Sequence, residues 1–249
     1  MTGPNSYASL ITLVIILVPY IFADVTTVYY VSTKTSIIVL IFVVLLQMVS
    51  IICMIMAAVM DPGYIPRRSF IKVIKCDRSE LSLEEQAIPF FNQYIYNKAH
   101  LIKLKYWYTC EIFRPPRTSH CAICDAWIER IDHHCPWLGT CIGKRNYKYF
   151  FIFINLLSIL QILGIILSII EIIIRVDEKV SEGNSTSKAI RESLRESPFP
   201  MIVIGVVIIT ALFVVILWIY HHRLACLNIT TNEEIKGSYS KTNAINPYK

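Results

Sequence analysis

The stretch CEIFRPPRTSHCAICDAWIERIDHHCPWLGTC, residues 110–141, carries most of the reactive side chains of this chain. It holds five of the eight cysteines and three of the six histidines found in 249 residues. Its end reads Asp132-His133-His134-Cys135-Pro136-Trp137. Cysteine sulfur and histidine nitrogen are the ligands that zinc prefers in proteins, so the cluster predicts a metal site with a candidate nucleophile inside it.

The composition around this stretch predicts a membrane protein. Hydrophobic residues make up 55% of the chain and charged residues 17%, which is unusual for a soluble domain of this size. A helix needs about 20 apolar residues to cross a bilayer. Four runs are long enough, and we predict a transmembrane helix in each: Leu10 to Tyr30, Ser36 to Met60, Tyr149 to Ile174 and Pro200 to Tyr220. The predicted fold class is an α-helical polytopic membrane protein.

The predicted helices divide the chain into four regions. These are residues 1–60 with helices 1 and 2, a loop at 61–148 with a cysteine-rich domain at about 105–148, residues 149–220 with helices 3 and 4 and a loop at 175–199, and a tail at 221–249. The loop 61–148 holds 14 of the 24 Lys and Arg residues, whereas the first connection holds only Lys34. Because basic residues favour the cytoplasmic side, we predict that both termini and the cysteine-rich domain are cytosolic. The loop 175–199 is then lumenal, although its five basic residues weaken the contrast.

Four side chains of the cluster have the spacing of zinc ligands. Cys121 and Cys124 form a C-x2-C pair, and His134 and Cys141 can complete a tetrahedral Cys3His site of the closed, structural type. In a reducing compartment such a cluster binds metal or catalyses more often than it forms disulfides. The alternative is a chance cluster of buried thiols. A small loop-rich segment needs a metal or a similar cross-link, because its own core contributes little stability.

Cys135 remains outside that ligand set and is the candidate nucleophile. A free thiol has a pKa of about 8.5 and needs a base or a positive neighbour to ionise at neutral pH. Pro136 disfavours a helical conformation at Cys135, and in an extended chain residues two apart point to the same side. His133 and Cys135 should therefore face one way and His134 the other. Asp132 can orient His133 only if the chain bends, and the sequence does not explain such a bend.

At these residues the chain resembles the DHHC protein S-acyltransferases (palmitoyltransferases), most closely the members of the Ras-palmitoyltransferase type. The resemblance also rests on several motifs outside the cluster. These are Arg114-Pro115-Pro116-Arg117, Cys141-Ile142-Gly143, Asn146-Tyr147, Asp61-Pro62-Gly63, the TTxE motif Thr230-Thr231-Asn232-Glu233 and the NPY motif Asn246-Pro247-Tyr248. The four predicted membrane helices and the loop between helices 2 and 3 fit the same family.

The resemblance implies a ping-pong acyl transfer from fatty acyl-CoA through an acyl-enzyme at Cys135. His133 would act as the base and Asp132 would hold its tautomer. Family members place the TTxE threonine near the catalytic aspartate and the C-terminal asparagine in a hydrogen-bond network, which implies supporting roles for Thr230 and Asn246.

The resemblance also suggests three contacts with acyl-CoA. Arg114 and Arg117 would bind its phosphates, with a solvated basic turn as the alternative. Trp137 would pack against the acyl chain, with an interfacial structural tryptophan as the alternative.

The departures from the family pattern fall in one place. The usual domain has a second zinc site, to which Cys110 and His120 would contribute here, but its two outer cysteine positions are Trp107 and Trp127. Two remaining ligands are fewer than the four of a structural zinc site. We therefore predict one Zn²⁺ per chain, with the two tryptophan rings replacing the second metal by apolar packing.

Two other classes of protein compete with an active acyltransferase. A degenerate membrane scaffold or substrate-binding subunit would have the same fold, but it would be free to lose Asp132, His133 or Cys135. A transporter or channel is less consistent with spans that contain few polar groups and no paired charges at mid-membrane. The resemblance further implies Golgi or endoplasmic reticulum membranes, cysteine-containing membrane-associated protein substrates and, for some members, an accessory subunit. Nucleic acid is not an expected partner.

Overall fold

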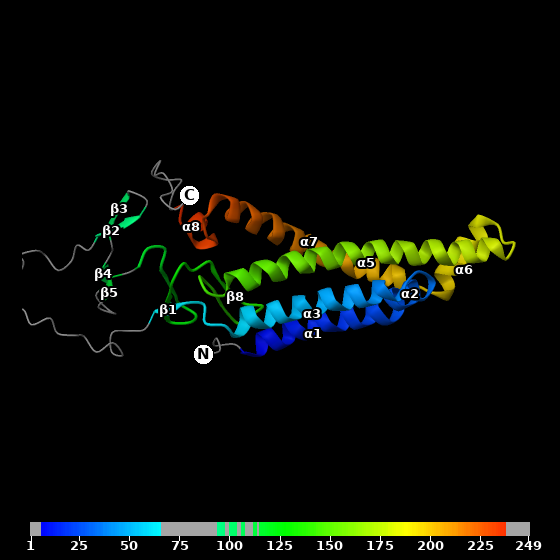
Figure 1. The fold of residues 1–249 in the computed structure, drawn as a ribbon, viewed down its shortest axis with the longest axis horizontal. Coiled ribbons are helices and arrows are strands. Elements are labelled where there is room, and N and C mark those ends of the chain that lie inside the picture. Colours follow the sequence, from blue (N-terminus) through cyan, green and yellow to red (C-terminus); the bar gives the residue numbers. More distant parts are fainter. Residues whose placement is uncertain are drawn as a thin grey trace, which may run out of the picture.

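Four long apolar helices dominate the structure, a computed structural model that describes residues 6–65, 94–97, 100–103, 106–107, 112–113 and 115–237. Tyr7–Lys34, Ile37–Val59, Tyr147–Ser181 and Phe199–Leu227 are each long and apolar enough to cross a membrane. The helices lie side by side along the long axis of the molecule, and the strands cluster beyond one end of them (Figure 1). The arrangement is that of a multi-pass membrane protein with its cysteine-rich domain between helices 2 and 3.

The helices differ in detail from the predicted spans. The first comprises α1 (Ser6–Ala23), the π-helical turn η1 (Asp24–Val28) and α2 (Tyr29–Lys34). The others are α3 (Ile37–Val59), α5 (Tyr147–Ser181), α6 (Thr186–Glu196), α7 (Phe199–Leu227) and α8 (Thr231–Ile235). The predicted loop 175–199 is mostly helical, because α5 continues to Ser181 and α6 follows it. The last long helix continues seven residues past Tyr220 and ends where Asn228 adopts a left-handed backbone conformation, with φ 49°.

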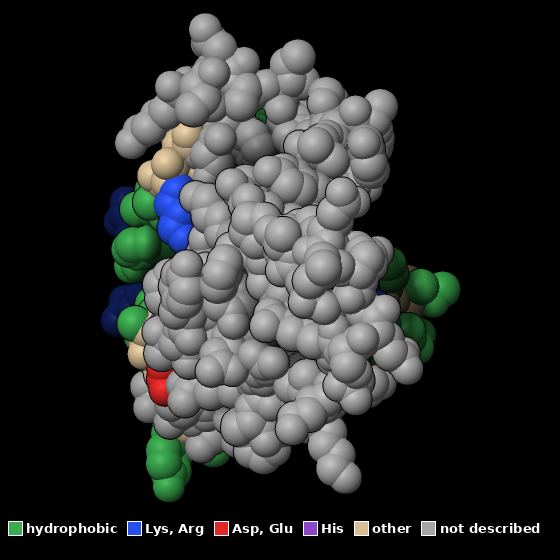
Figure 2. Space-filling view, turned by 90° about the vertical axis from the view of Figure 1, so that its left-hand side faces the viewer, with side chains coloured by type: hydrophobic (Ala, Val, Ile, Leu, Met, Phe, Trp, Pro, Cys, Tyr) green, Lys and Arg blue, Asp and Glu red, His purple; other side chains and the backbone are tan. Residues whose placement is uncertain are grey.

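Apolar side chains cover the outer faces of these helices, as expected for surfaces that meet lipid. Exposed hydrophobic residues occur along all four, for example Ile15, Phe42, Ile162 and Phe213. Figure 2 looks along the helices from the strand-bearing end, and hydrophobic side chains predominate among the coloured atoms at its rim. Inside the bundle, Asp24 accepts a hydrogen bond from Gln47 Nε2 at 3.0 Å, which gives this intramembrane carboxylate a polar partner.

The strands are short and antiparallel. They are β1 (Tyr64–Ile65), β2 (Tyr94–Asn97), β3 (His100–Lys103), β4 (Tyr106–Trp107), β5 (Ile112–Phe113), β6 (Ser119–Cys121), β7 (Ala126–Ile128), β8 (His133–Cys135) and β9 (Thr140–Ile142). β7 pairs with both β1 and β6, while β2–β3, β4–β5 and β8–β9 form two-stranded pairs. Strands this short bury little surface. The stability of the cysteine-rich domain therefore depends on its contacts with the helices and on its clustered Cys and His side chains.

A buried asparagine joins the β8–β9 hairpin to the helices. Asn146 Nδ2 donates to the carbonyl oxygens of Ala57 and Cys141, each at 2.9 Å, and its Oδ1 accepts from the Gly143 N–H at 2.8 Å. Gly143 also allows a close approach, because an added Cβ would lie 2.5 Å from the carbonyl oxygen of Pro62. The ends of α3 and α5 thereby hold β9 in a fixed place.

Candidate functional site

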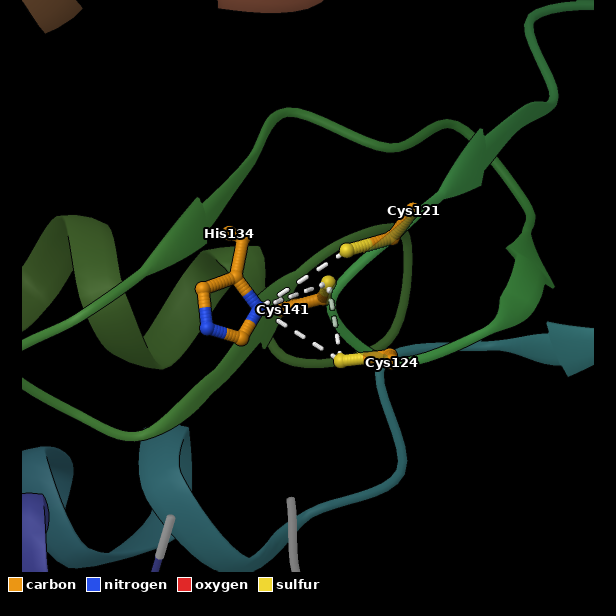
Figure 3. A group of neighbouring side chains, drawn as sticks. All are labelled: Cys121, Cys124, His134 and Cys141. Carbon is orange, nitrogen blue, oxygen red and sulfur yellow. Dashed lines mark hydrogen bonds between the residues drawn. The ribbon is translucent and has the colours of Figure 1, made fainter. Parts of the chain in front are cut away.

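Four side chains converge at the base of the β8–β9 hairpin in the arrangement of a metal site (Figure 3). The Nδ1 atom of His134 lies 3.8 Å from the sulfur of Cys121 and 3.4 Å from the sulfurs of Cys124 and Cys141. The sulfurs of Cys124 and Cys141 are 3.5 Å apart. The structure thus brings together the four residues that the sequence selected as a ligand set.

These distances fit a zinc ion. Tetrahedral coordination, with Zn–S about 2.3 Å and Zn–N about 2.0–2.1 Å, places neighbouring ligand atoms about 3.5–3.8 Å apart. Burial raises the pKa of both Cys124 and Cys141, and the neighbouring Cys121 thiol raises both further, so three thiolates would be unfavourable here without a cation. A divalent metal would supply that charge. The donor set is therefore consistent with zinc.

His133 lies on the opposite side of β8 from the ligand set and is hydrogen-bonded to Asp132. The His133 Nδ1 and Asp132 Oδ2 atoms are 2.7 Å apart. Burial alone would lower the pKa of His133, but its hydrogen bonds with Asp132 and Cys135 raise that pKa to about 9. Asp132 is buried too, which favours its neutral form, yet His133 and the Thr231 N–H lower the pKa of its carboxyl group. The His133 imidazole, held by Asp132, is therefore suited to taking a proton from a neighbouring thiol.

The bend that aligns Asp132 with His133 originates just before β8. Arg130 has a left-handed backbone, with φ 47°, and turns the chain before the strand begins. The Asp132 N–H then donates to the carbonyl oxygen of Ile142, and its own carbonyl oxygen accepts from the Asn232 N–H at 3.0 Å. These distant contacts explain a bend that the residues of the strand do not predict.

Cys135 is buried where the cysteine-rich domain meets the helices. Its neighbours in one apolar cluster include Met54 and Ala57 from α3 and Phe150 and Phe153 from α5. The thiol therefore faces hydrophobic side chains at the end of the membrane helices, with His133 as its polar neighbour.

The threonine that supports Asp132 is Thr231 and not the predicted Thr230. The Thr231 N–H donates to Asp132 Oδ1 at 2.9 Å, and its hydroxyl donates to Oδ2 at 2.8 Å. Thr230 instead begins α8: its Oγ1 accepts from the Glu233 N–H, and Glu233 Oε2 accepts from the Thr230 N–H. This reciprocal capping box fixes the turn, so that the next residue points at Asp132.

Arg117 forms a buried ion pair in this structure. Its Nε and Nη2 atoms each lie 2.6 Å from a carboxylate oxygen of Glu233, and Nη2 also donates to the Asn228 carbonyl oxygen at 3.0 Å. The two charged side chains are each 7% exposed. The guanidinium group is thus enclosed by the turn between α7 and α8, and its contact with CoA phosphates stays a prediction.

The region of the second family zinc site contains an aromatic contact. Trp127 is 4% exposed, and its ring meets the imidazole of His120 edge-on, with centroids 5.3 Å apart. His120 Nε2 also lies 3.3 Å from an oxygen of Asp125. Trp127 and His120 therefore pack together, while one zinc per chain stays a prediction, because Cys110 lies outside the described residues and the structure describes Trp107 only as backbone of β4.

The remaining predicted site residues are Trp137, Arg114 and Asn246. Trp137 is 67% exposed, and its carbonyl oxygen accepts from the hydroxyl of Thr12 in α1 at 2.6 Å. Its contact with an acyl chain remains a prediction. Arg114 and Asn246 lie outside the described residues.

Besides Thr231, sequence reasoning missed His221 of α7. A ring nitrogen of His221 lies within 4.8 Å of ligand atoms of Asp132 and His133. Two imidazoles and a carboxylate can bind a metal, but both oxygens of Asp132 already accept hydrogen bonds from His133 or Thr231. Because its oxygens are already engaged, Asp132 is better suited to orienting His133 than to binding a metal. The sequence signal that could have found His221 is its position near the end of an apolar helix.

The fold and the site together define a polytopic membrane protein with a Cys-His-Asp group beside a Cys3His ligand set, at the end of its helices. The chain belongs to the DHHC palmitoyltransferase family, because the family model of that description matches residues 100–238. It is similar to palmitoyltransferase ZDHHC9 from Bos taurus, with 37% identity over 226 residues, which cover 88% of this chain and 60% of that protein.

Human relatives give a similar picture. ZDHHC9 is 37% identical over 88% of this chain and 59% of its own length, and palmitoyltransferase ZDHHC18 is 32% identical over 88% of this chain and 56% of its own length. The chain thus spans less than two thirds of the length of these curated relatives.

Proposed function

We propose that this protein is a protein S-acyltransferase that moves a fatty acyl group, most simply palmitoyl, from acyl-CoA to cysteines of substrate proteins. The observation that carries the proposal is the buried thiol of Cys135 beside His133, whose Nδ1 lies 2.7 Å from Asp132. Membership of the DHHC family and the names of the relatives support the same activity. The scaffold alternative has no observation in its favour, because all three reactive residues are together.

In the first step, the Cys135 sulfur attacks the carbonyl carbon of the acyl-CoA thioester while His133 takes the thiol proton. The carbon–sulfur bond to CoA breaks, and His133 returns the proton to the departing CoA thiolate. Asp132 holds the ring of His133 and stabilises its charged form. The product is an acyl thioester on Cys135 and free CoA.

In the second step, a substrate cysteine gives its proton to His133 and attacks the acyl thioester. The acyl group passes to the substrate, and Cys135 leaves as a thiolate that recovers the proton. The apolar neighbours of Cys135 at the ends of α3 and α5 suit an acyl chain that extends among the helices. Zinc would be held by Cys121, Cys124, His134 and Cys141, and when bound it would fix the hairpin that carries Cys135.

The setting of the proposed enzyme follows from the same features. α1 begins and α8 ends on the strand-bearing side (Figure 1), so the cysteine-rich domain and both described ends share one side of the membrane. We infer that this side is the cytosol, because the loop 61–148 holds 14 of the 24 Lys and Arg residues. Golgi or endoplasmic reticulum membranes, membrane-associated protein substrates and an accessory subunit remain parts of the proposal that the family suggests.

The test is acyl labelling of the purified full-length protein with a labelled palmitoyl-CoA. We expect a hydroxylamine-sensitive label on the wild type and none on C135S. C226S is the matched control, since Cys226 is an exposed thiol near the end of α7, and it should label as the wild type does. A label that persists in C135S, or its absence from the wild type in the presence of bound zinc, would refute the proposal.

A further inference from the structure

A second histidine, His221, lies next to the proposed catalytic pair. It is 2% exposed and comes from α7, six residues before that helix ends at Leu227. One of its ring nitrogens is within 4.8 Å of a carboxylate oxygen of Asp132 and a ring nitrogen of His133. A polar ring is costly to bury without polar partners, so its place beside this carboxylate calls for an explanation.

Three rings pack against one another around the base. The centroids of His133 and Phe150 are 5.3 Å apart at 67°, and those of His221 and Phe150 are 5.0 Å apart at 74°. His133 and His221 complete the triangle, with centroids 5.8 Å apart at 45°. The hydrogen bonds of His133 with Asp132 and Cys135 still allow its ring to tilt, and the two neighbouring rings restrict that tilt.

A hydrogen bond in turn orients His221. The Tyr147 hydroxyl lies 3.4 Å from His221 Nδ1, and Tyr147 is the first residue of α5, directly after the buried Asn146. A tyrosine hydroxyl can donate or accept, so it can satisfy Nδ1 in either tautomer. Contacts within α7 and with Tyr147 of α5 therefore hold the imidazole of His221 in place beside Asp132 and His133.

We propose that His221 is a positioning residue for the acyl transfer at Cys135: it holds the ring of His133 in place and offers a polar group to the buried carboxylate of Asp132. The inference rests on the proposed function. His221 acts through His133 and does not itself touch the reacting atoms. It adds α7 to the elements that organise the site, beside β8 and the TTxE turn.

Substitutions that separate shape from polarity test this role. H221F keeps an aromatic ring but loses the nitrogens, whereas H221Q loses the ring and keeps an amide N–H. The matched control is H222Q, because His222 is the next residue but turns to Phe151, Trp218 and the Trp218 carbonyl oxygen. The readouts are the single-turnover rate of acyl-enzyme formation at saturating palmitoyl-CoA, the KM for palmitoyl-CoA, zinc content and the thermal midpoint.

We expect H221F to slow acyl-enzyme formation about tenfold or more, the range typical of residues that orient a functional ligand, with KM and zinc content unchanged. H221Q, which keeps an amide N–H but loses the ring that packs against His133, should also be slower than the wild type, and H222Q should match the wild type. Equal rates for H221F and the wild type, or a loss confined to KM, would overturn the inference. If H221F does not fold, H221L against H221Q makes the same comparison. Failure of the proposed function would differ, since the wild type itself would then form no acyl-enzyme at Cys135.

Discussion

Replacing Arg117 with methionine should detach the turn between α7 and α8 from the cysteine-rich domain. Arg117 makes two contacts of 2.6 Å with the Glu233 carboxylate and a third with the Asn228 carbonyl oxygen. Both charged side chains are 7% exposed, so R117M leaves a carboxylate buried without its cation. Removing one partner of such a pair costs about 3–5 kcal/mol. For a chain of this size that corresponds to a fall in Tm on the order of 10 °C.

The same turn provides the control. Arg223 and Glu234 also form an ion pair, 2.8 Å long, but their side chains are 55% and 33% exposed, and an exposed pair contributes about 0.2–1 kcal/mol. Thermal unfolding of the two purified variants in one detergent should therefore show a large shift for R117M and a small one for R223M. Equal shifts would refute the argument from burial.

A functional readout accompanies the stability measurement. Glu233 forms the capping box that points Thr231 at Asp132, so R117M should slow acyl-enzyme formation more than R223M does, even below the unfolding temperature. The double variant R117M/E233Q should recover part of the lost stability, because it removes the buried charge that R117M leaves behind.

Three further predictions concern the metal site, the aromatic packing and the hairpin. His134→Ala should release zinc and lower the thermal midpoint, whereas His133→Ala should keep zinc and slow acylation; equal zinc loss by elemental analysis would contradict this division. Trp127→Ala should lower the free energy of unfolding by about 3–5 kcal/mol while the zinc content stays at one ion per chain. Two zinc ions in the wild type would show that aromatic packing has not replaced the second zinc site. Gly143→Ala should destabilise by about 1–3 kcal/mol, whereas Gly164→Ala, with room for a methyl group, should be tolerated; similar thermal midpoints would show that the backbone yields.

Much of the fold follows from the apolar runs, because a membrane span leaves a long continuous signal. The ends of the helices are less predictable. The last long helix passes Tyr220 and includes two histidines and an arginine, since it stops only where Asn228 becomes left-handed. An asparagine after an apolar run is a known C-terminal signal, but the polar residues before it suggested an earlier end.

The metal ligands could be predicted because they are close in sequence and have characteristic spacing. The supporting contacts could not, because they join segments about 100 residues apart. Thr231 meets Asp132 across 99 residues and Arg117 meets Glu233 across 116. His221 is one of two adjacent histidines and carries no motif, so it is indistinguishable from an ordinary helix residue until the fold places it beside His133.

Within the described residues one complete Cys3His ligand set is present, and contacts from two directions support the strands around it. The four candidate ligands come from β6, the turn before β7, and the β8–β9 hairpin, so a bound metal would cross-link these segments. α8 also contacts β6, because Asn232 and Lys236 both donate to the hydroxyl of Ser119, at 3.0 and 2.8 Å. Together with the Arg117–Glu233 pair, these contacts make the C-terminal turn a second clamp on the cysteine-rich domain. Chelation of zinc should therefore loosen the hairpin that carries Cys135 before it releases α8, an order that hydrogen exchange of the two segments can resolve.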